Sequence, residues 1–400
     1  MKSVIIISHA LEIGGAERAL LGLLETFDYS KYDVSLFLMR HDGDFLSLLP
    51  EKVKLLPEIK EYTGLAVPMT SIIKKELFGV ALGRLIAKIK AKWYVKKHNI
   101  KKDNGVELEY SHKYTVKIMP AISDKEYDLA ISFLTPHYFA AEKVKAKKKI
   151  AWIHTDYSTV DIDVKSEDIM WSKYDRIISI SDDCTKGFLS KFPNLESKIL
   201  PVENIISPDF IHKQSEMEDV SDEMNSGDAL KILSVGRFST AKNFDNVPDI
   251  CRRIVENGIN LKWFLIGYGG DEELIKNNIR QAGMEEHVII LGKKSNPYPY
   301  IKHCDVYVQP SRYEGKCVAV REAQILGKPV VITNYATAHS QLKNGFDGVI
   351  VPLDNERCAE EISELLKNSE KLKLLSENCS RNNYSNAVEL EKIYEFIEND

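Results

Sequence analysis

Short runs of aliphatic and β-branched residues alternate with helical patterns along the whole chain. In the first half these runs predict strands at 4–8, 34–38, 129–133, 149–154, 176–179 and 198–202. In the second half they predict strands at 231–235, 262–266, 288–291, 306–310, 329–333 and 348–351. Continuous apolar runs separated by helices are typical of parallel strands that are buried on both faces. Two such sets predict an α/β protein with two Rossmann-like, doubly wound domains.

A polar segment separates the two sets of strands. Residues 211–230 are rich in Asp, Glu, Ser and Met, which predicts an exposed acidic linker. We therefore expect an N-terminal domain over 1–210 and a C-terminal domain over 231–383. Apolar residues at 388, 390, 393, 394 and 397 then predict a final helix within 384–400.

The segment 74–102 differs from the rest of the chain in its charge. It holds nine Lys and one Arg against a single acid, Glu76. Apolar residues at 78, 82, 85, 86, 89 and 93 follow helical spacing, which predicts a basic amphipathic helix. Two interpretations are open. The helix either attaches to an anionic membrane, where each basic residue contributes about 1 kcal/mol, or packs its apolar stripe on the first domain. The density of basic residues favours the membrane slightly.

Composition narrows the class of protein. The chain has 400 residues, 44% of them hydrophobic and 28% charged, as in ordinary globular proteins. A net charge of -5 argues against a dedicated nucleic-acid binder. No apolar run has the length of a membrane span, and the start of the chain reads as a strand, not a signal peptide. Six scattered cysteines without metal-ligand spacing predict a reduced, cytoplasmic protein with no zinc site.

Glycines and cations follow several predicted strands. Gly14 and Gly15 come after the first strand, where a glycine turn and a helix start suit an anion, although a tight turn alone explains them too. Gly236 follows the strand 231–235, and Arg237 and Lys242 come directly after it. Arg can grip phosphate oxygens and Lys supplies a point charge. Taken singly, these cations would be ordinary surface residues, but the carboxyl end of a parallel strand is where ligands bind in this fold.

Two glutamates form the most specific pattern in the sequence. Glu314 and Glu322 lie eight positions apart after the strand 306–310, and the residues after Gly315 look helical. Both carboxylates would then lie on nearby faces and could accept hydrogen bonds from sugar hydroxyls. Backbone N–H groups of 315–317 would point at an anion or hydroxyl. Alternatively, Glu314 is a surface residue and Glu322 pairs with Arg321 or Lys328.

His154 is a further candidate. It ends the buried strand 149–154, where it would face the ligand side of the sheet. It could donate to a developing charge or hold a sugar hydroxyl. A structural histidine that bonds to backbone is an equal alternative.

Together these residues resemble a known family. The Gly-Gly-Ala-Glu-Arg sequence at 14–18, the Gly-Arg and Lys-Asn pairs within 236–243, and the two glutamates within 310–323 are similar to the retaining glycosyltransferases of family four. This family belongs to the glycogen-synthase-like superfamily and has the GT-B fold. The resemblance covers most of the chain and is weakest over 45–120. It implies two Rossmann-like domains that face a central cleft, with the last helix crossing back to the N-terminal domain.

The resemblance also implies roles for individual residues. Arg237 and Lys242 would neutralise the departing diphosphate, and His154 and Glu314 would contact the transferred sugar. The expected donor-binding residues are Gly14, Gly15, Gly236, Gly267, Lys293, Gly315, Lys316, Cys317, Val318 and Glu322, with Glu322 on the ribose and Lys293 beside the base. Lys316 and Cys317 depart from the aromatic or aliphatic residues that many relatives carry there.

The function implied is retaining transfer of a sugar from a nucleotide-diphosphate donor to a glycan or lipid-linked glycan, as in bacterial surface polysaccharide synthesis. The donor would lie mainly on the C-terminal domain and the acceptor on the N-terminal domain. No metal or other cofactor is expected, and no nucleic-acid partner. The expected location is cytoplasmic, on the inner face of the cell membrane if 74–102 binds lipid. The alternatives are a sugar-nucleotide epimerase or hydrolase of the same fold, or a non-catalytic subunit that binds sugar nucleotides.

Overall fold

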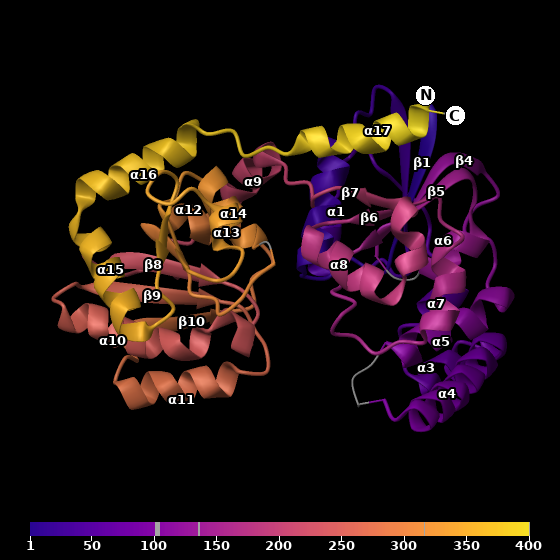
Figure 1. Ribbon diagram of the computed structural model, residues 1–400, viewed down its shortest axis with the longest axis horizontal. Helices are drawn as coiled ribbons and strands as arrows, with labels where there is room; N and C mark the ends of the chain where they lie inside the picture. Colours follow the sequence, from indigo (N-terminus) through magenta and orange to yellow (C-terminus); the bar gives the residue numbers. More distant parts are fainter. Residues whose placement is uncertain (101–104, 135–136, 316, 400) are drawn as a thin grey trace. The chain divides into compact units, whose positions relative to one another are not determined.

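The chain folds into two compact units. A computed structural model describes residues 1–100, 105–134, 137–315 and 317–399 (Figure 1). Unit 1 comprises Met1–Ile206 and Asn386–Asp400, and unit 2 comprises Ser207–Ser385. Each unit is built around one parallel β-sheet, so the prediction of two doubly wound α/β domains is confirmed.

Unit 1 contains a seven-stranded sheet with the order β3-β2-β1-β4-β5-β6-β7. The strands are β1 (Lys2–Ser8), β2 (Tyr32–Leu38), β3 (Lys54–Leu55), β4 (Glu126–Ser132), β5 (Lys145–Ile153), β6 (Arg176–Ser179) and β7 (Ile199–Pro201). The helices are α1 (Gly15–Thr26), α2 (Lys60–Thr63), α3 (Met69–Lys74), α4 (Phe78–His98), α5 (Val106–Thr115), α6 (His137–Lys143), α7 (Val164–Trp171) and α8 (Asp182–Lys191). A large aromatic core forms between the sheet and these helices, with Phe37, Tyr62, Phe139, Trp171 and Phe188 at its centre.

Unit 2 contains a six-stranded sheet with the order β10-β9-β8-β11-β12-β13. The strands are β8 (Leu230–Val235), β9 (Leu261–Ile266), β10 (Val288–Gly292), β11 (Val306–Gln309), β12 (Val330–Thr333) and β13 (Val349–Val351). The helices are α9 (Pro208–Ser215), α10 (Val247–Glu256), α11 (Glu272–Ala282), α12 (Tyr298–His303), α13 (Val318–Ile325), α14 (Ala338–Gln341), α15 (Asn355–Lys367) and α16 (Ser369–Arg381). Helices α10 and α11 lie on one face of this sheet, and α12 and α13 lie on the other (Figure 1).

The strand predictions hold because most of the apolar runs are buried, while the runs that form the edge strands β7, β10 and β13 are partly buried. All twelve predicted strands are present, most of them within one or two residues of the expected bounds. Two differences have simple causes. The pair Lys54–Leu55 that forms β3 is exposed, so it carries no hydrophobic signal. Strand β5 begins at Lys145, ahead of the predicted start, because its polar first half still pairs with β4.

The segment expected as an acidic linker belongs to unit 2. Helix α9 begins at Pro208, after Ser207 has capped it by accepting a hydrogen bond from the Phe210 N–H. Phe210 and Ile211 are buried, and α9 packs on α12 and α13. The Asn296 amide also donates to the Gln214 carbonyl at 2.8 Å. The polar stretch is held on unit 2 by four buried apolar side chains: Phe210, Ile211, Val220 and Met224.

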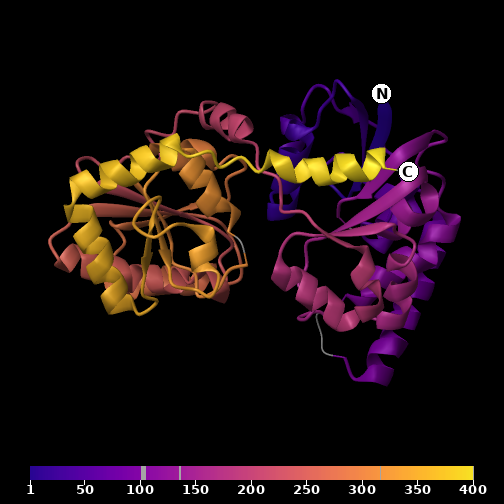
Figure 2. The same ribbon diagram turned by 45° about the horizontal axis from the view of Figure 1, so that its top comes forward.

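The last helix crosses back to the first unit, as the resemblance implies. Helix α17 (Glu391–Glu398) lies beside the N-terminal strand in both views (Figure 2). Its Tyr394 ring stacks on Tyr32, with centroids 4.6 Å apart, and its hydroxyl accepts from the Asp28 N–H at 2.8 Å. Lys2 donates to the Ile397 carbonyl at 3.0 Å, which ties the two ends of the chain together.

The basic amphipathic segment forms a long helix with a break before it. Helix α3 ends at Lys74, Glu76 adopts a left-handed conformation (φ 59°), and α4 runs from Phe78 to His98. Lys101 and Lys102 lie outside the described residues. Among the residues that the structure describes, no helix has both the length and the apolar character needed to cross a bilayer.

Candidate functional site

The candidate site lies where the strand order of unit 2 reverses. From β8 the chain proceeds outward through β9 and β10, then returns to β11 on the other side of β8 and proceeds through β12 and β13. The loops after β8 and β11 therefore leave the centre of the sheet side by side and then diverge. In open parallel sheets this switch point is where ligands bind, because the diverging loops leave room at the carboxyl ends of the strands.

The loop after β8 presents the two predicted cations differently. The Arg237 side chain is exposed and makes no hydrogen bond or ion pair with any described residue. Lys242, by contrast, folds back over Gly236. A Cβ built at Gly236 would lie 3.2 Å from the Lys242 side chain, so a larger residue there would crowd it. Arg237 is thus available to an added ligand, while Lys242 is held in place.

Lys242 forms an ion pair with the first of the two glutamates. Its Nζ lies 2.5 Å from Glu314 Oε1, and the two side chains are 20% and 11% exposed. The Ser311 hydroxyl donates to the same carboxylate oxygen at 2.6 Å. Burial alone would lower the pKa of Lys242, but the neighbouring Cys317 and Glu314 raise it above its usual value. The ammonium group therefore keeps its charge at this partly buried position.

The start of α13 lies next to the pair of Lys242 and Glu314. Cys317 caps this helix, and its Sγ lies 3.9 Å from Lys242 Nζ. Its backbone N–H, which we expected to face an anion, instead donates to Gln341 Oε1 at 2.7 Å, and the Gln341 amide donates back to the Cys317 carbonyl. Burial raises the pKa of the Cys317 thiol to about 11, so it is uncharged at neutral pH. Gly315 and Val318 flank this position with partly or fully exposed surfaces, and Lys316 lies outside the described residues.

Glu322 occupies a more buried place about one turn into α13. Only 1% of it is exposed, and its Oε1 accepts from the Tyr298 hydroxyl at 3.0 Å. Burial raises the pKa of Tyr307 well above its usual value, and the carboxylates of Glu322 and Glu314 add to this shift. The Tyr307 hydroxyl is therefore neutral, and it donates to Gln309 Oε1 at 2.7 Å. The two alternative partners of Glu322 are engaged elsewhere: Arg321 lies over the Tyr384 ring, and Lys328 donates to the Cys304 carbonyl.

Two further predicted residues lie on neighbouring strand ends. Gly267 follows β9, and a Cβ there would lie 1.9 Å from the Gly236 carbonyl oxygen, so only glycine allows these loops to approach so closely. Lys293 follows β10, is exposed, and places its Nζ over the Tyr268 ring at 5.5 Å. Both positions therefore border the loop that carries Arg237.

A clamp that sequence reasoning missed joins the loops after β8 and β11. Arg312 forms a two-pronged ion pair with Asp245, at 2.8 and 2.7 Å, and its backbone N–H donates to the Ala241 carbonyl. Asn243, in a left-handed conformation (φ 61°), donates to the Pro310 carbonyl at 2.9 Å. A polar Asn directly after Lys242 is a local signal for such a turn. The pairing of Arg312 with Asp245 has no comparable signal.

The predicted residues of the first domain lie at strand ends of unit 1: Gly14 and Gly15 come after β1, which meets β4 at the switch point of this sheet, and His154 comes after the next strand, β5. Gly14 directly precedes α1, and Gly15, the first residue of that helix, is exposed, with open space around it. His154 follows β5. Burial lowers its pKa to about 4, although a hydrogen bond that the ring donates to the Phe133 backbone carbonyl opposes this, so the ring is neutral at pH 7. Its Nε2 is buried and has no hydrogen-bond partner among the described residues.

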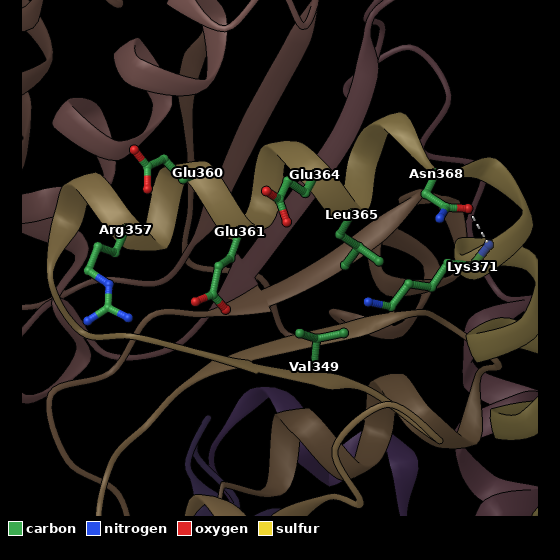
Figure 3. Close-up of a pocket in the computed structure, with 8 residues that line it drawn as sticks. All are labelled: Val349, Arg357, Glu360, Glu361, Glu364, Leu365, Asn368 and Lys371. Atoms are coloured by element: carbon green, nitrogen blue, oxygen red, sulfur yellow. Dashed lines mark hydrogen bonds between the residues drawn. The ribbon is translucent and has the colours of Figure 1, made fainter.

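A separate pocket of about 490 Å³ lies elsewhere on unit 2 (Figure 3). Helix α15 lines it with Glu360, Glu361 and Glu364, and two cations, Arg357 and Lys371, lie at its ends. Three carboxylates on one wall would repel a diphosphate. This pocket is therefore unsuited to a sugar nucleotide.

The segment that contains the pair of Lys242 and Glu314 is similar to a known protein family. Residues 217–383 match the family described as Glycosyl transferases group 1. This match contains Arg237, Lys242, Glu314 and Glu322, and it lies within unit 2. Two of the three motifs that carry the resemblance, those within 236–243 and 310–323, therefore lie inside the family match, and the motif at 14–18 lies outside it.

Two curated relatives are similar over part of the chain. The Escherichia coli UDP-Gal:alpha-D-GlcNAc-diphosphoundecaprenol alpha-1,3-galactosyltransferase is 27% identical over 161 residues, which are 40% of this chain and 41% of that protein. The Campylobacter jejuni N-acetylgalactosamine-N,N'-diacetylbacillosaminyl-diphospho-undecaprenol 4-alpha-N-acetylgalactosaminyltransferase is 26% identical over 183 residues, 44% of this chain and 49% of that protein. The chain thus aligns with less than half the length of either relative.

Similarity to solved structures extends over the whole chain. HepE from Anabaena, solved in complex with UDP and glucose, matches with a TM-score of 0.65 and 14% sequence identity, covering 100% of both chains. At this identity the match establishes the fold alone. The predicted GT-B fold is therefore confirmed.

Proposed function

We propose that this chain is a retaining glycosyltransferase that moves a sugar from a nucleotide-diphosphate donor to a lipid-linked glycan, in bacterial polysaccharide synthesis. The observation that carries the proposal is the buried pair of Lys242 and Glu314 at the switch point of unit 2. This pair lies inside the segment that matches glycosyl transferases of group 1. The curated names of both relatives specify acceptors linked to diphosphoundecaprenol.

In the proposed mechanism, unit 2 holds the donor. Arg237 and Lys242 neutralise the diphosphate as the bond between the anomeric carbon and its phosphate oxygen breaks. Such electrostatic stabilisation is commonly the largest contribution to catalysis. Glu314 accepts hydrogen bonds from the transferred sugar, and Glu322 accepts from the ribose. The cation and the carboxylate are already adjacent, so one donor could contact both.

The acceptor is proposed to bind unit 1, where His154 and the Gly14–Gly15 turn lie at strand ends. The acceptor hydroxyl attacks the anomeric carbon on the face from which the diphosphate leaves. Its proton passes to the departing phosphate oxygen, so configuration is retained. Neutral His154, whose Nε2 has no hydrogen-bond partner among the residues that the structure describes, could hold a sugar hydroxyl during this step. Because two protein cations offset the diphosphate charge, the proposed reaction needs no metal ion.

Donor choice is the first test. The protein would be melted in the presence of UDP-glucose, UDP-galactose, UDP-N-acetylglucosamine, GDP-mannose and ADP-glucose. The true donor stabilises the folded state by about 2.7 kcal/mol when present at 100 times its Kd. Arg237→Ala should lose this rise in Tm, whereas Arg280→Ala, an exposed arginine on α11, should keep it. A chain that no sugar nucleotide stabilises would contradict the proposal.

Turnover then separates the candidate reactions. The selected donor would be incubated with and without polyprenyl-diphosphate-linked sugars, and the anomeric configuration of the product would be read by NMR. A glycosyltransferase consumes donor only when acceptor is present. An epimerase or hydrolase consumes donor without acceptor, and a binding subunit consumes none. An inverted product would refute retention while leaving glycosyl transfer intact.

A further inference from the structure

Helix α4 has two opposite faces of very different character. One face carries small residues and is buried, with Gly83, Ala87 and Ala91 packed on α5. A Cβ added at Gly83 would lie 2.9 Å from the Thr115 side chain, so this face is pressed closely against its neighbour. The contact with unit 1 is therefore made by small side chains.

The bulky apolar residues of α4 lie on the other face. The side chains of Phe78, Leu82, Leu85, Ile86, Ile89 and Trp93 are 39–63% exposed. At 3.6 residues per turn they fall within an arc of about 100°, roughly opposite the buried face. The apolar stripe therefore does not pack on unit 1, which was one of the two interpretations of this segment.

Positive charge surrounds this stripe. At helical spacing, Lys88 and Lys92 fall along one edge, and Lys90 and Lys97 fall along the other. These four, together with Lys74, Lys75 and Lys96, are exposed, and none forms an ion pair with a carboxylate of the described residues. The Lys97 ammonium lies 4.8 Å from the Trp93 ring centroid. This local charge contrasts with a net charge of -5 for the whole chain.

We propose that this face of α4 docks on an anionic phospholipid surface, with the apolar stripe inserted among the acyl chains and the lysines at the headgroups. An apolar stripe with basic edges is the pattern of helices that lie in a bilayer interface. A second copy of this chain is a poorer occupant, because seven lysines would face seven lysines across a symmetric contact. The inference rests on the proposed function in one respect: the proposed function gives the reason for docking, which is access to a lipid-linked acceptor.

Tryptophan fluorescence can test the docking directly. The chain has four tryptophans: Trp152, Trp171 and Trp263 are at most 1% exposed, whereas Trp93 is 62% exposed. Vesicles of equal parts phosphatidylglycerol and phosphatidylcholine should shift the emission to the blue and protect it from acrylamide. Trp93→Phe should remove the shift while the protein still sediments with the vesicles. Vesicles of phosphatidylcholine alone should bind about tenfold less protein.

Matched variants complete the test. Leu82→Ser with Ile89→Ser should lower vesicle partitioning about tenfold or more, whereas the control pair Ile169→Ser with Leu374→Ser, also exposed on helices, should change it less than about twofold. Absence of binding to anionic vesicles, or equal binding to phosphatidylcholine, would overturn the proposal. So would a wild-type dimer in ultracentrifugation that the Leu82 and Ile89 variant abolishes. The assay uses neither donor nor acceptor, and donor-induced rises in Tm should persist in all these variants, so failure here is distinct from failure of the proposed reaction.

Discussion

Removing either partner of the pair between Lys242 and Glu314 should cost stability and activity, but removing both should cost mainly activity. Lys242→Met leaves Glu314 only 11% exposed, with the Ser311 hydroxyl as the remaining polar contact of its carboxylate among the described residues. Glu314→Gln likewise leaves the ammonium without its carboxylate. Deleting one member of a fully buried pair costs about 3–5 kcal/mol. The residual exposure and the Ser311 hydrogen bond reduce this to about 2–3 kcal/mol, or a fall in Tm of roughly 4–12 °C for a unit of this size.

The double variant separates structure from chemistry. Lys242→Met combined with Glu314→Gln leaves no unpaired charge, so a coupling energy of about 1.5–3 kcal/mol should return most of the lost stability. Turnover should nevertheless stay at least about 100-fold below wild type in the two variants that lack Lys242, because the cation opposite the diphosphate is missing. In Glu314→Gln turnover should also fall, because the carboxylate that holds this cation and faces the sugar is gone. Lys276→Met on α11, where the lysine pairs with Glu272 at an exposed position, is the control and should cost less than about 0.5 kcal/mol.

The two single variants, the double variant and the wild type form a double-mutant cycle. Their free energies of unfolding would be measured in urea and by heat, and their initial rates would be measured on the donor selected above. Recovery of turnover in the double variant would show that the pair is only structural. Single variants that melt like the wild type would show that the two charges are not coupled, and the reasoning from their burial would be refuted.

Three further outcomes follow from other contacts. Arg237→Ala should lower turnover by about 100-fold or more with an unchanged Tm, and chelation by EDTA should leave the wild-type rate unaltered; a rate that depends on added Mg²⁺ would contradict the metal-free scheme. Tyr394→Ala should destabilise unit 1 by about 3–4 kcal/mol in urea unfolding, since it removes a stacked ring and an acceptor for the Asp28 N–H, whereas Val388→Ala, which is exposed, should cost less than about 0.5 kcal/mol. Burial, aided by neighbouring Glu167, raises the pKa of Glu109 to about 8, so the folded state favours the neutral acid; stability from this group is complete below about pH 4.5 and is lost as pH rises to 8. Glu109→Gln should therefore gain about 1–3 kcal/mol over wild type at pH 9 and little at pH 5, and an equal gain at both values would refute the assignment.

Much of the fold follows from local sequence, because buried parallel strands need continuous apolar runs. The glycines at strand ends were also predictable, since Gly267 lies where no side chain fits. Contacts between segments that are distant in the sequence were not predictable. Lys242 and Glu314 are 72 positions apart, and their pairing depends on β8 and β11 being neighbours in the sheet. Arg312 and Asp245 meet for the same reason.

The sequence also contains local signals for α9 and for the buried face of α4, but a stronger signal from composition or hydrophobicity pointed to a different interpretation. Phe210 and Ile211, next to a Ser-Pro helix start, signal α9, yet the acidic composition that follows them suggested a linker. In α4, Gly83, Ala87 and Ala91 recur every fourth residue. Such a row of small residues permits close helix packing, and it identifies the buried face better than hydrophobicity does. The large apolar residues point the other way because that face has no partner within the described parts of unit 1.

The return of α17 to unit 1 determines the order in which the protein can be completed on the ribosome. Every residue of unit 2 precedes Asn386, so unit 2 leaves the ribosome before the segment 386–400 that unit 1 still needs. Unit 1 begins to form first, yet it lacks Tyr394 until the final residues emerge. Ile206 and Asn386 are then joined by a hydrogen bond of 2.9 Å, at the point where the chain leaves unit 1 and later comes back to it. The first half of the gene product is thus the last to reach its finished state.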